Sequence, residues 1–150
     1  LLGTGEKSWE KKFEKMNKKG KYKGSISVNI EFSVDLANKI YAGSDYFFVP
    51  SRYEPCGLTQ MIAMHYGAPP IVRNVGGLKD TVDDGENGFT FDEYSSLDLN
   101  KAVTRALKLY ENKQDYKKMV EKALAKDFSW DVSAKKYVDL YQKIISSKKG

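Results

Sequence analysis

The sequence contains one cysteine, Cys56, and one histidine, His65. A single cysteine excludes a disulfide bond within the chain and is typical of proteins from reducing compartments. Because the histidine has no second histidine or cysteine at ligand spacing, the sequence gives no indication of a zinc site. No segment has the length and hydrophobicity of a membrane span, and no secretory signal peptide is recognisable. These shortages argue against a disulfide-stabilised scaffold, a zinc protein and a membrane-spanning protein.

The chain has 150 residues, of which 41% are hydrophobic, and ten are tyrosine, seven phenylalanine and two tryptophan. This is the size of one ordinary domain with enough apolar residues for a core. The net charge of +5 arises from lysines that are mixed with glutamates, as in residues 6–23 and 113–126. Such mixing is typical of solvated helix faces, so we expect no nucleic acid and no membrane as a partner.

Short apolar segments alternate with helical patterns as far as Phe91, and only helical patterns follow. This order predicts an α/β fold with a Rossmann-like parallel sheet flanked by helices. A basic, solvated loop is expected at residues 18–24. Strands are expected at the following residues: 1–2, 26–32, 46–50, 69–72 and 89–91. At their carboxyl ends, one ligand-binding edge of the sheet should gather Gly3, Phe32, Glu54, Gly57 and Gly76.

The most informative stretch is Ser-Arg-Tyr-Glu-Pro-Cys-Gly-Leu-Thr-Gln, residues 51–60. It joins the strand expected at 46–50 to a helix expected at 58–66 and closed by Gly67. A ligand can approach the backbone closely at Gly57. The N–H groups at a helix start favour an anion such as a phosphate, and here they belong to Gly57, Leu58 and Thr59.

Glu54 lies within this stretch and has two interpretations. Its carboxylate can accept a hydrogen bond from a hydroxylated ligand such as a sugar. Alternatively, it caps the start of the following helix and interacts favourably with the helix dipole. The spacing of the residues leaves both interpretations open.

The ten-residue stretch, followed by His65-Tyr66-Gly67 and by Val-Gly-Gly-Leu-Lys-Asp-Thr-Val at residues 75–82, resembles a known family. It is similar to the C-terminal domain of bacterial glycogen synthases and plant starch synthases, from Leu1 to about Tyr141. These enzymes are retaining GT-B glycosyltransferases that use ADP-glucose or a related sugar nucleotide. The resemblance implies the donor-binding domain of a GT-B fold that lacks its first strand.

The resemblance also implies roles for individual residues. Glu54 is the catalytic residue, and it hydrogen-bonds the donor glucose. The backbone of Gly57, Leu58 and Thr59 binds the glucose and the diphosphate, and the Thr59 hydroxyl reaches the ribose or a phosphate. Cys56 lines the sugar pocket. Phe32 occupies the position of an aromatic ring that stacks on adenine, although the residues alone equally allow an ordinary core position. No metal and no cofactor other than the sugar nucleotide is expected.

The sequence departs from the family in two respects. Many related transferases carry a second glutamate eight positions after the first, where this chain has Ile62; glycogen synthases lack it as well. The family's Lys-x-Gly-Gly-Leu loop, its acceptor groove for the α-1,4-glucan and its diphosphate-binding Arg and Lys have no counterpart here. We therefore expect a fragment that is inactive alone, whose last helix, from about residue 130, packs towards an absent N-terminal domain.

Three functions remain compatible with these residues. The first is a glycogen or starch synthase fragment in the cytoplasm, or in the plastid of a plant or alga. The second is a non-catalytic ADP or sugar-nucleotide binding module. The third is a structural or carbohydrate-associated domain with a vestigial motif. The sequence does not distinguish ADP from UDP as the donor base, or glycogen from starch as the product.

Overall fold

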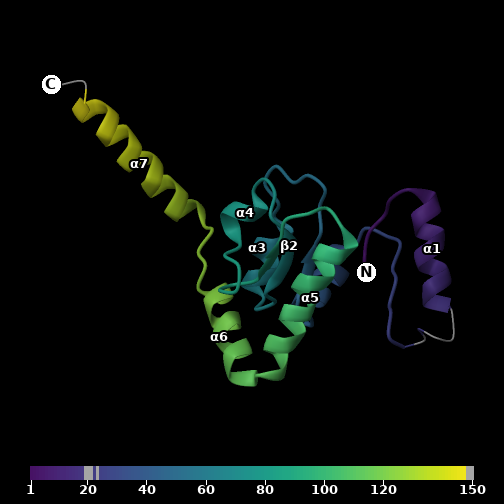
Figure 1. The fold of residues 1–150 in the computed structure, drawn as a ribbon. Coiled ribbons are helices and arrows are strands. Elements are labelled where there is room, and N and C mark those ends of the chain that lie inside the picture. Colours follow the sequence, from purple (N-terminus) through teal and green to yellow (C-terminus); the bar gives the residue numbers. More distant parts are fainter. Residues whose placement is uncertain (19–21, 23, 148–150) are drawn as a thin grey trace. The chain divides into compact units, whose positions relative to one another are not determined.

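The structure is a computed structural model, and it describes residues 1–18, 22 and 24–147. The chain divides into two compact units, Leu1–Gly43 and Ser44–Gly150, and each is described by itself (Figure 1). Most of the basic loop expected at residues 18–24 lies outside the described residues.

The first unit contains two helices, α1 at Lys7–Lys18 and α2 at Val34–Ala42. The Ser33 side chain caps α2 as its sequence position predicts, because its hydroxyl accepts a hydrogen bond from the Leu36 N–H at 3.2 Å. Phe32, directly before this cap, has an exposed fraction of 89%. The interpretation of Phe32 as an ordinary core residue is therefore wrong.

The regular strand predicted at residues 26–32 is wrong, because it is reduced to one parallel bridge between Leu2 and Asn29. The Leu1 amino group donates to the Ser27 carbonyl at 2.8 Å, and the Asn29 N–H donates to the Leu1 carbonyl at 2.9 Å. The Gly3 N–H then donates to the Asn29 carbonyl at 3.1 Å. These hydrogen bonds involve only the middle of the predicted strand.

The second unit contains a parallel three-stranded sheet in the order β1-β2-β3. Its strands are β1 at Phe47–Val49, β2 at Pro70–Arg73 and β3 at Phe89–Phe91. Phe48 is in register with Ile71 across the first pair, and Ile71 is in register with Phe89 across the second. These strands confirm three of the predicted segments and the predicted parallel arrangement.

In the described part of this unit, helices follow or separate the strands, and α7 extends away from the sheet (Figure 1). The helices are α3 at Thr59–His65, α4 at Leu78–Thr81, α5 at Ser96–Glu111, α6 at Lys113–Leu124 and α7 at Trp130–Ser147. The end predicted for α3 is confirmed, since Gly67 has a φ of +79° and its N–H donates to the Met64 carbonyl at 2.9 Å. None of the described residues of α7 is buried, and most of its apolar side chains are exposed.

The side chains of β2 alternate between two cores, one on each face of the sheet. Val72 belongs to the first core, together with Val49, Met64, Leu78, Val82 and Ala123. Ile71 belongs to the second core, together with Phe89, Phe91, Ala102, Ala106 and Met119. Helix α6 therefore contributes to both cores, Ala123 to the first and Met119 to the second.

The buried face of α5 is made of small residues. Leu107 lies outside it, with an exposed fraction of 58%. Ala102 and Ala106 are the fully buried residues of this helix. Small side chains let the helix approach the sheet closely. The buried face of the helix is therefore centred on these two alanines and excludes the larger Leu107.

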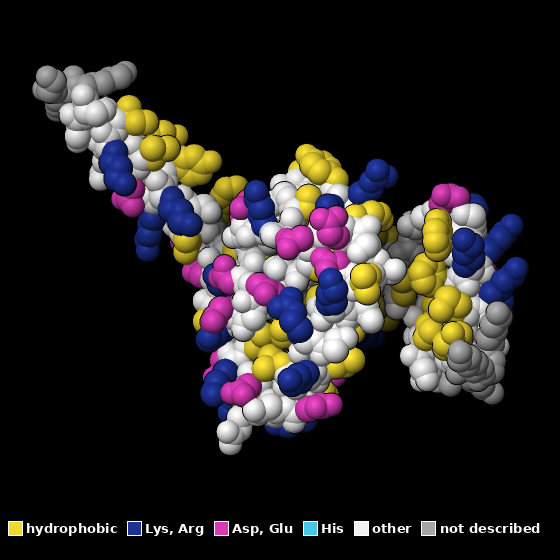
Figure 2. All heavy atoms as spheres, in the orientation of Figure 1, with side chains coloured by type: hydrophobic (Ala, Val, Ile, Leu, Met, Phe, Trp, Pro, Cys, Tyr) yellow, Lys and Arg dark blue, Asp and Glu magenta, His cyan; other side chains and the backbone are white. Residues whose placement is uncertain are grey.

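The acidic segment at residues 83–88 is joined to α5 and α6 by ion pairs. The Arg105 guanidinium donates to both carboxylate oxygens of Asp84, at 2.8 and 3.0 Å. Lys126 pairs with Asp83 at 2.6 Å, and Lys122 pairs with Glu86. Figure 2 shows such positive and negative side chains interspersed over the surface of this unit, as the sequence predicted.

The unfolding free energy should depend on pH through Asp84. Burial alone would raise the pKa of this carboxyl, but hydrogen bonds from Arg105 and the Thr90 N–H lower it below its ordinary value of 3.8. A lowered folded-state pKa gives stability that is present above the unfolded-state pKa and lost as the pH falls through the folded-state pKa. We expect Asp84→Asn to cost about 0.5–1 kcal/mol near neutral pH, as for an exposed pair.

Urea unfolding followed by circular dichroism, from about pH 7 to below pH 3, measures this difference. The difference between wild type and Asp84→Asn should shrink towards the acid end. Asp139→Asn is the control, because Asp139 on α7 is exposed and forms no ion pair with a described residue. A difference that stays constant across the pH range would contradict the role given to the carboxylate.

Candidate functional site

Two turns follow the carboxyl ends of adjacent strands β1 and β2. We call residues 51–58 the first turn and residues 74–77 the second turn. The first leads into α3 and the second into α4. In open α/β sheets this edge is where ligands bind. The two turns therefore form the candidate site.

The backbones of the two turns are in direct contact. The Gly77 N–H donates to the Glu54 carbonyl at 3.1 Å. A Cβ atom at Gly76 would lie 1.9 Å from that same carbonyl oxygen, and one at Gly77 would lie 2.3 Å from the Cys56 carbonyl oxygen. Gly76 also has a φ of +50°, which disfavours other residues. At each of these two positions, only glycine fits.

Arg73, the last residue of β2, joins the loops that follow its two neighbouring strands. Its Nη1 donates to the Arg52 carbonyl in the first turn at 2.6 Å. Its Nε donates to the carbonyl of Asp92, directly after β3, at 3.1 Å. This role was not predicted from the sequence, although an arginine at the end of a buried strand was a usable signal.

Gln60 joins the two turns from inside the protein. This side chain is completely buried, and its Nε2 donates to the Gly57 carbonyl at 2.7 Å. The same nitrogen lies 3.4 Å from the Cys56 carbonyl and 3.2 Å from the Thr81 hydroxyl. That hydroxyl in turn donates to the Gly77 carbonyl at 3.1 Å. The role of Gln60 was not predicted from the sequence either, because nothing in its neighbours predicts a buried amide.

The carboxylate of Glu54 is half-buried and faces the first turn itself. Its Oε2 accepts a hydrogen bond from the Ser51 hydroxyl at 3.4 Å. Helix α3 begins at Thr59, and its N-cap residue is Leu58, with no side-chain cap. The interpretation of Glu54 as a helix cap is therefore wrong, and the carboxylate can accept hydrogen bonds from a ligand.

The first turn presents unused backbone donors. Gly57 has a φ of +72°. Within the described part of the chain, the N–H groups of Gly57, Leu58 and Thr59 have no hydrogen-bond acceptor. Cys56, Leu58 and Thr59 are all exposed. The turn thus combines one carboxylate, one thiol and several free N–H groups on an accessible surface.

The structure brings together two of the residues predicted for this edge. Glu54 and Gly76 meet at the contact between the two turns, and Gly57 lies in the first turn, against the Gln60 side chain. Gly3 and Phe32 belong to the first unit, so the position of these two residues at the ligand-binding edge stays a prediction. Among the described residues, no group of three or more His, Cys, Asp or Glu side chains has the arrangement of a metal site. No helix in the described ranges is long and apolar enough to cross a membrane.

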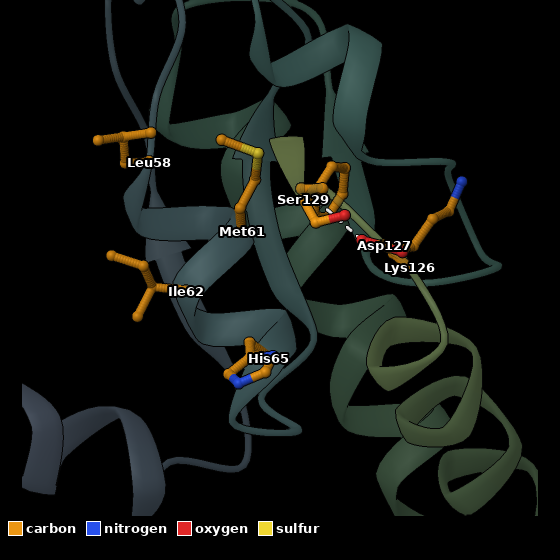
Figure 3. A pocket seen from close by; sticks show the side chains of 8 residues that line it. Leu58, Met61, Ile62, His65, Lys126, Asp127 and Ser129 are labelled. Carbon is orange, nitrogen blue, oxygen red and sulfur yellow. Dashed lines mark hydrogen bonds between the residues drawn. The ribbon is translucent and has the colours of Figure 1, made fainter. Parts of the chain in front are cut away.

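An open groove of about 480 Å³ begins beside the first turn. Figure 3 shows that α3 forms one wall and that the segment at residues 126–129 forms the other. The α3 wall is mostly apolar and carries Leu58, Met61, Ile62 and His65. The single histidine thus lies on the mostly apolar wall of this groove, and Asp127 lies on the opposite wall (Figure 3).

Comparison with known proteins gives one family for most of the chain. The family model described as glycosyl transferases group 1 matches residues 1–124. Glycogen synthases from Kosmotoga olearia and Thermodesulfovibrio yellowstonii are each 48% identical to the chain, over 153 and 146 residues. These matches cover 98% and 97% of this chain but 32% and 29% of the two relatives, so the chain spans about a third of their length.

Solved structures agree with this comparison. The catalytic domain of starch synthase IV from Arabidopsis thaliana, bound to ADP and acarbose, has a TM-score of 0.83 and 37% identity. The match covers 96% of this chain and 31% of that structure. Anabaena HepE in complex with UDP-glucose has a TM-score of 0.67 at 22% identity, which shows a shared fold only.

The contact between the turns predicts different costs for two glycines. Gly76 and Gly85 have similar backbone conformations, with φ of +50° and +76°. A Cβ atom at Gly85 would meet nothing within 4 Å, whereas one at Gly76 would overlap the Glu54 carbonyl. Gly85→Ala should cost only the strain of a left-handed alanine, about 1–2 kcal/mol. Gly76→Ala should cost about 1–3 kcal/mol more, because backbone atoms must move.

Chemical unfolding of the two variants and the wild type measures the costs of both substitutions. Equal losses of unfolding free energy would mean that the two turns separate without strain, contrary to the close contact described above.

Proposed function

Because the chain belongs to the group 1 glycosyl transferases, we propose that it is the donor-binding part of a glycogen or starch synthase. The longer protein transfers glucose from ADP-glucose to the non-reducing end of an α-1,4-glucan, with retention of configuration. The observation that carries this proposal is the start of α3, where the half-buried Glu54 carboxylate precedes three N–H groups, those of Gly57, Leu58 and Thr59, that have no acceptor among the described residues. The 48% identity to glycogen synthases supports the choice of enzyme.

The proposed division of labour follows from charge. As glucose is transferred, the diphosphate departs with negative charge, which hydrogen-bond donors stabilise. The N–H groups of Gly57, Leu58 and Thr59 face this leaving group and the sugar. Glu54 accepts a hydrogen bond from a glucose hydroxyl. The transition state resembles a positively charged oxocarbenium ion, which a carboxylate stabilises, and Glu54 is therefore the proposed catalytic residue. Cys56 lines the sugar pocket beside them.

ADP is the proposed nucleotide, and Phe32 is its proposed adenine contact. The exposed fraction of this ring, 89%, supports a role outside the core. The starch synthase IV structure contains ADP, which supports an adenine nucleotide over a uridine nucleotide. Phe32 stacks on the base but, unlike tyrosine, has no hydroxyl for a further hydrogen bond.

The acceptor glucan and the remaining phosphate contacts are assigned to the part of the protein that this chain does not span. We propose that the chain is a partial C-terminal domain and that its last helix packs back towards an N-terminal domain. The exposed Tyr137, Tyr141 and Ile145 of α7 support this arrangement, because an apolar helix face usually packs against protein. The proposed location is the cytoplasm.

The first test of the function is Glu54. In the longer protein, Glu54→Ala and Glu54→Gln should lower kcat with ADP-glucose and glycogen by about a hundredfold or more, because a transition-state contact is lost. Radiolabelled glucose incorporation measures this rate, and the isolated 150-residue chain should show none. Near-normal turnover by Glu54→Ala would refute the catalytic role. A wild-type protein that binds ADP without transfer would favour the non-catalytic binding module.

The second test is Phe32. Replacing Phe32 by Ala should weaken ADP binding by about 1–3 kcal/mol, the size of a lost base–aromatic stack. Phe32→Tyr keeps the ring and should bind ADP as well as the wild type or better. Isothermal titration calorimetry measures both affinities, and a melting curve verifies that each variant is folded. Unchanged affinity of Phe32→Ala would exclude the stacking contact.

A further inference from the structure

We infer that Gln60 is a positioning residue, which orients the N–H groups of Gly57 and Leu58 outward, towards the donor diphosphate. The inference rests on the proposed function, because it concerns the donors of the same first turn. It adds a residue that does not itself touch the ligand, since the Gln60 side chain is completely buried.

Peptide geometry links the buried amide to the exposed donors. The C=O of one residue and the N–H of the next lie in one plane and, in a trans peptide, point in opposite directions. No cis peptide bond is present in the described residues. The Gly57 carbonyl accepts from the buried Gln60 Nε2 at 2.7 Å. The Leu58 N–H on the same peptide therefore points away from the interior.

The same geometry applies to the preceding peptide, although its hydrogen bond to Gln60 is longer. Gln60 Nε2 lies 3.4 Å from the Cys56 carbonyl, which shares its peptide plane with the Gly57 N–H. One side-chain amide thus holds two successive carbonyls inward and turns two successive N–H groups outward. These N–H groups have no acceptor in the part of the chain that the structure describes.

Without this amide the turn has another accessible conformation. Gly57 has no Cβ atom, so the peptide that follows it can rotate with little steric resistance. Rotation would place the Gly57 carbonyl outward, where its negative end would face the diphosphate. Gln60 opposes this rotation and is itself held by the Thr81 hydroxyl at 3.2 Å.

The Oε1 atom of Gln60 supports a positioning role over a purely structural one. It is buried and has no hydrogen-bond partner among the described residues. A buried polar atom without a partner lowers stability, so an apolar side chain of similar size would suit a core position better. The amide at this position is explained by the carbonyl groups to which its nitrogen donates.

The test uses the longer protein with three single variants. Gln60→Met keeps a similar length but removes the donor, and Gln60→Glu keeps the shape but replaces the donating nitrogen with an acceptor. Gln114→Met is the matched control, because Gln114 on α6 is exposed and its side chain forms no hydrogen bond with a described residue. Each variant is assayed for kcat and KM with ADP-glucose, for ADP affinity by calorimetry, and for its melting temperature.

We expect Gln60→Met to fold, with kcat/KM lowered by about tenfold to a hundredfold, near the effect of losing one transition-state donor. Gln60→Glu should lose at least as much, and Gln114→Met should match the wild type. Folded Gln60→Met with kcat/KM and ADP affinity within about twofold of the wild type would overturn the inference.

A second measurement keeps the inference testable if the variants do not fold. In the ¹⁵N-labelled wild-type protein, titration with ADP should shift the amide resonances of Gly57 and Leu58 more than that of Gln114. Unshifted Gly57 and Leu58 resonances would overturn the inference. Wild-type protein that binds ADP through these amides but transfers no glucose would refute the proposed synthase activity and leave the positioning role of Gln60 standing.

Discussion

The contact between the backbones of the first and second turns is the constraint on which the candidate site depends. Where the Gly77 N–H meets the Glu54 carbonyl, the backbones of the two turns approach so closely that neither Gly76 nor Gly77 has room for a Cβ atom. Because β1 and β2 are paired in the sheet, this contact fixes the turns at their far ends as well. Glu54 therefore occupies a defined place relative to a neighbouring strand, and not merely a place on a surface loop.

Polar side chains stabilise this arrangement from two directions. Arg73 donates to the Arg52 carbonyl at the strand end, and Gln60 donates to the Gly57 carbonyl from the interior. Each of these bonds satisfies a carbonyl of the first turn, whereas the N–H groups of Gly57 and Leu58 have no acceptor among the described residues. Unpaired backbone donors at a helix start favour an anion such as a phosphate.

The sequence predicts the elements of the second unit better than those of the first. The predicted strands at 46–50, 69–72 and 89–91 are confirmed because each has a neighbour of similar length. The strand predicted at 26–32 is reduced to one bridge, between Leu2 and Asn29. Alternating hydrophobicity predicts which side chains can be buried, but pairing also requires a second segment.

The same limit applies to the site. The motif at residues 51–60 locates Glu54 and the turn donors, because a local pattern is sufficient for that. Arg73 and Gln60 act through residues that are distant along the chain, Asp92 and Thr81 among them, so local spacing does not reveal their roles. Likewise, close packing of α5 against the sheet buries Ala102 and leaves the larger Leu107 exposed.

The position of α6 has a consequence for how the protein is made. Met119 completes one face of the sheet and Ala123 completes the other, and both lie far beyond the last strand in the chain. During synthesis on the ribosome, α6 emerges from the exit tunnel after all three strands and after α3, α4 and α5. Until α6 emerges, each face of the sheet lacks one of its buried residues, so the docking of this one helix completes both cores.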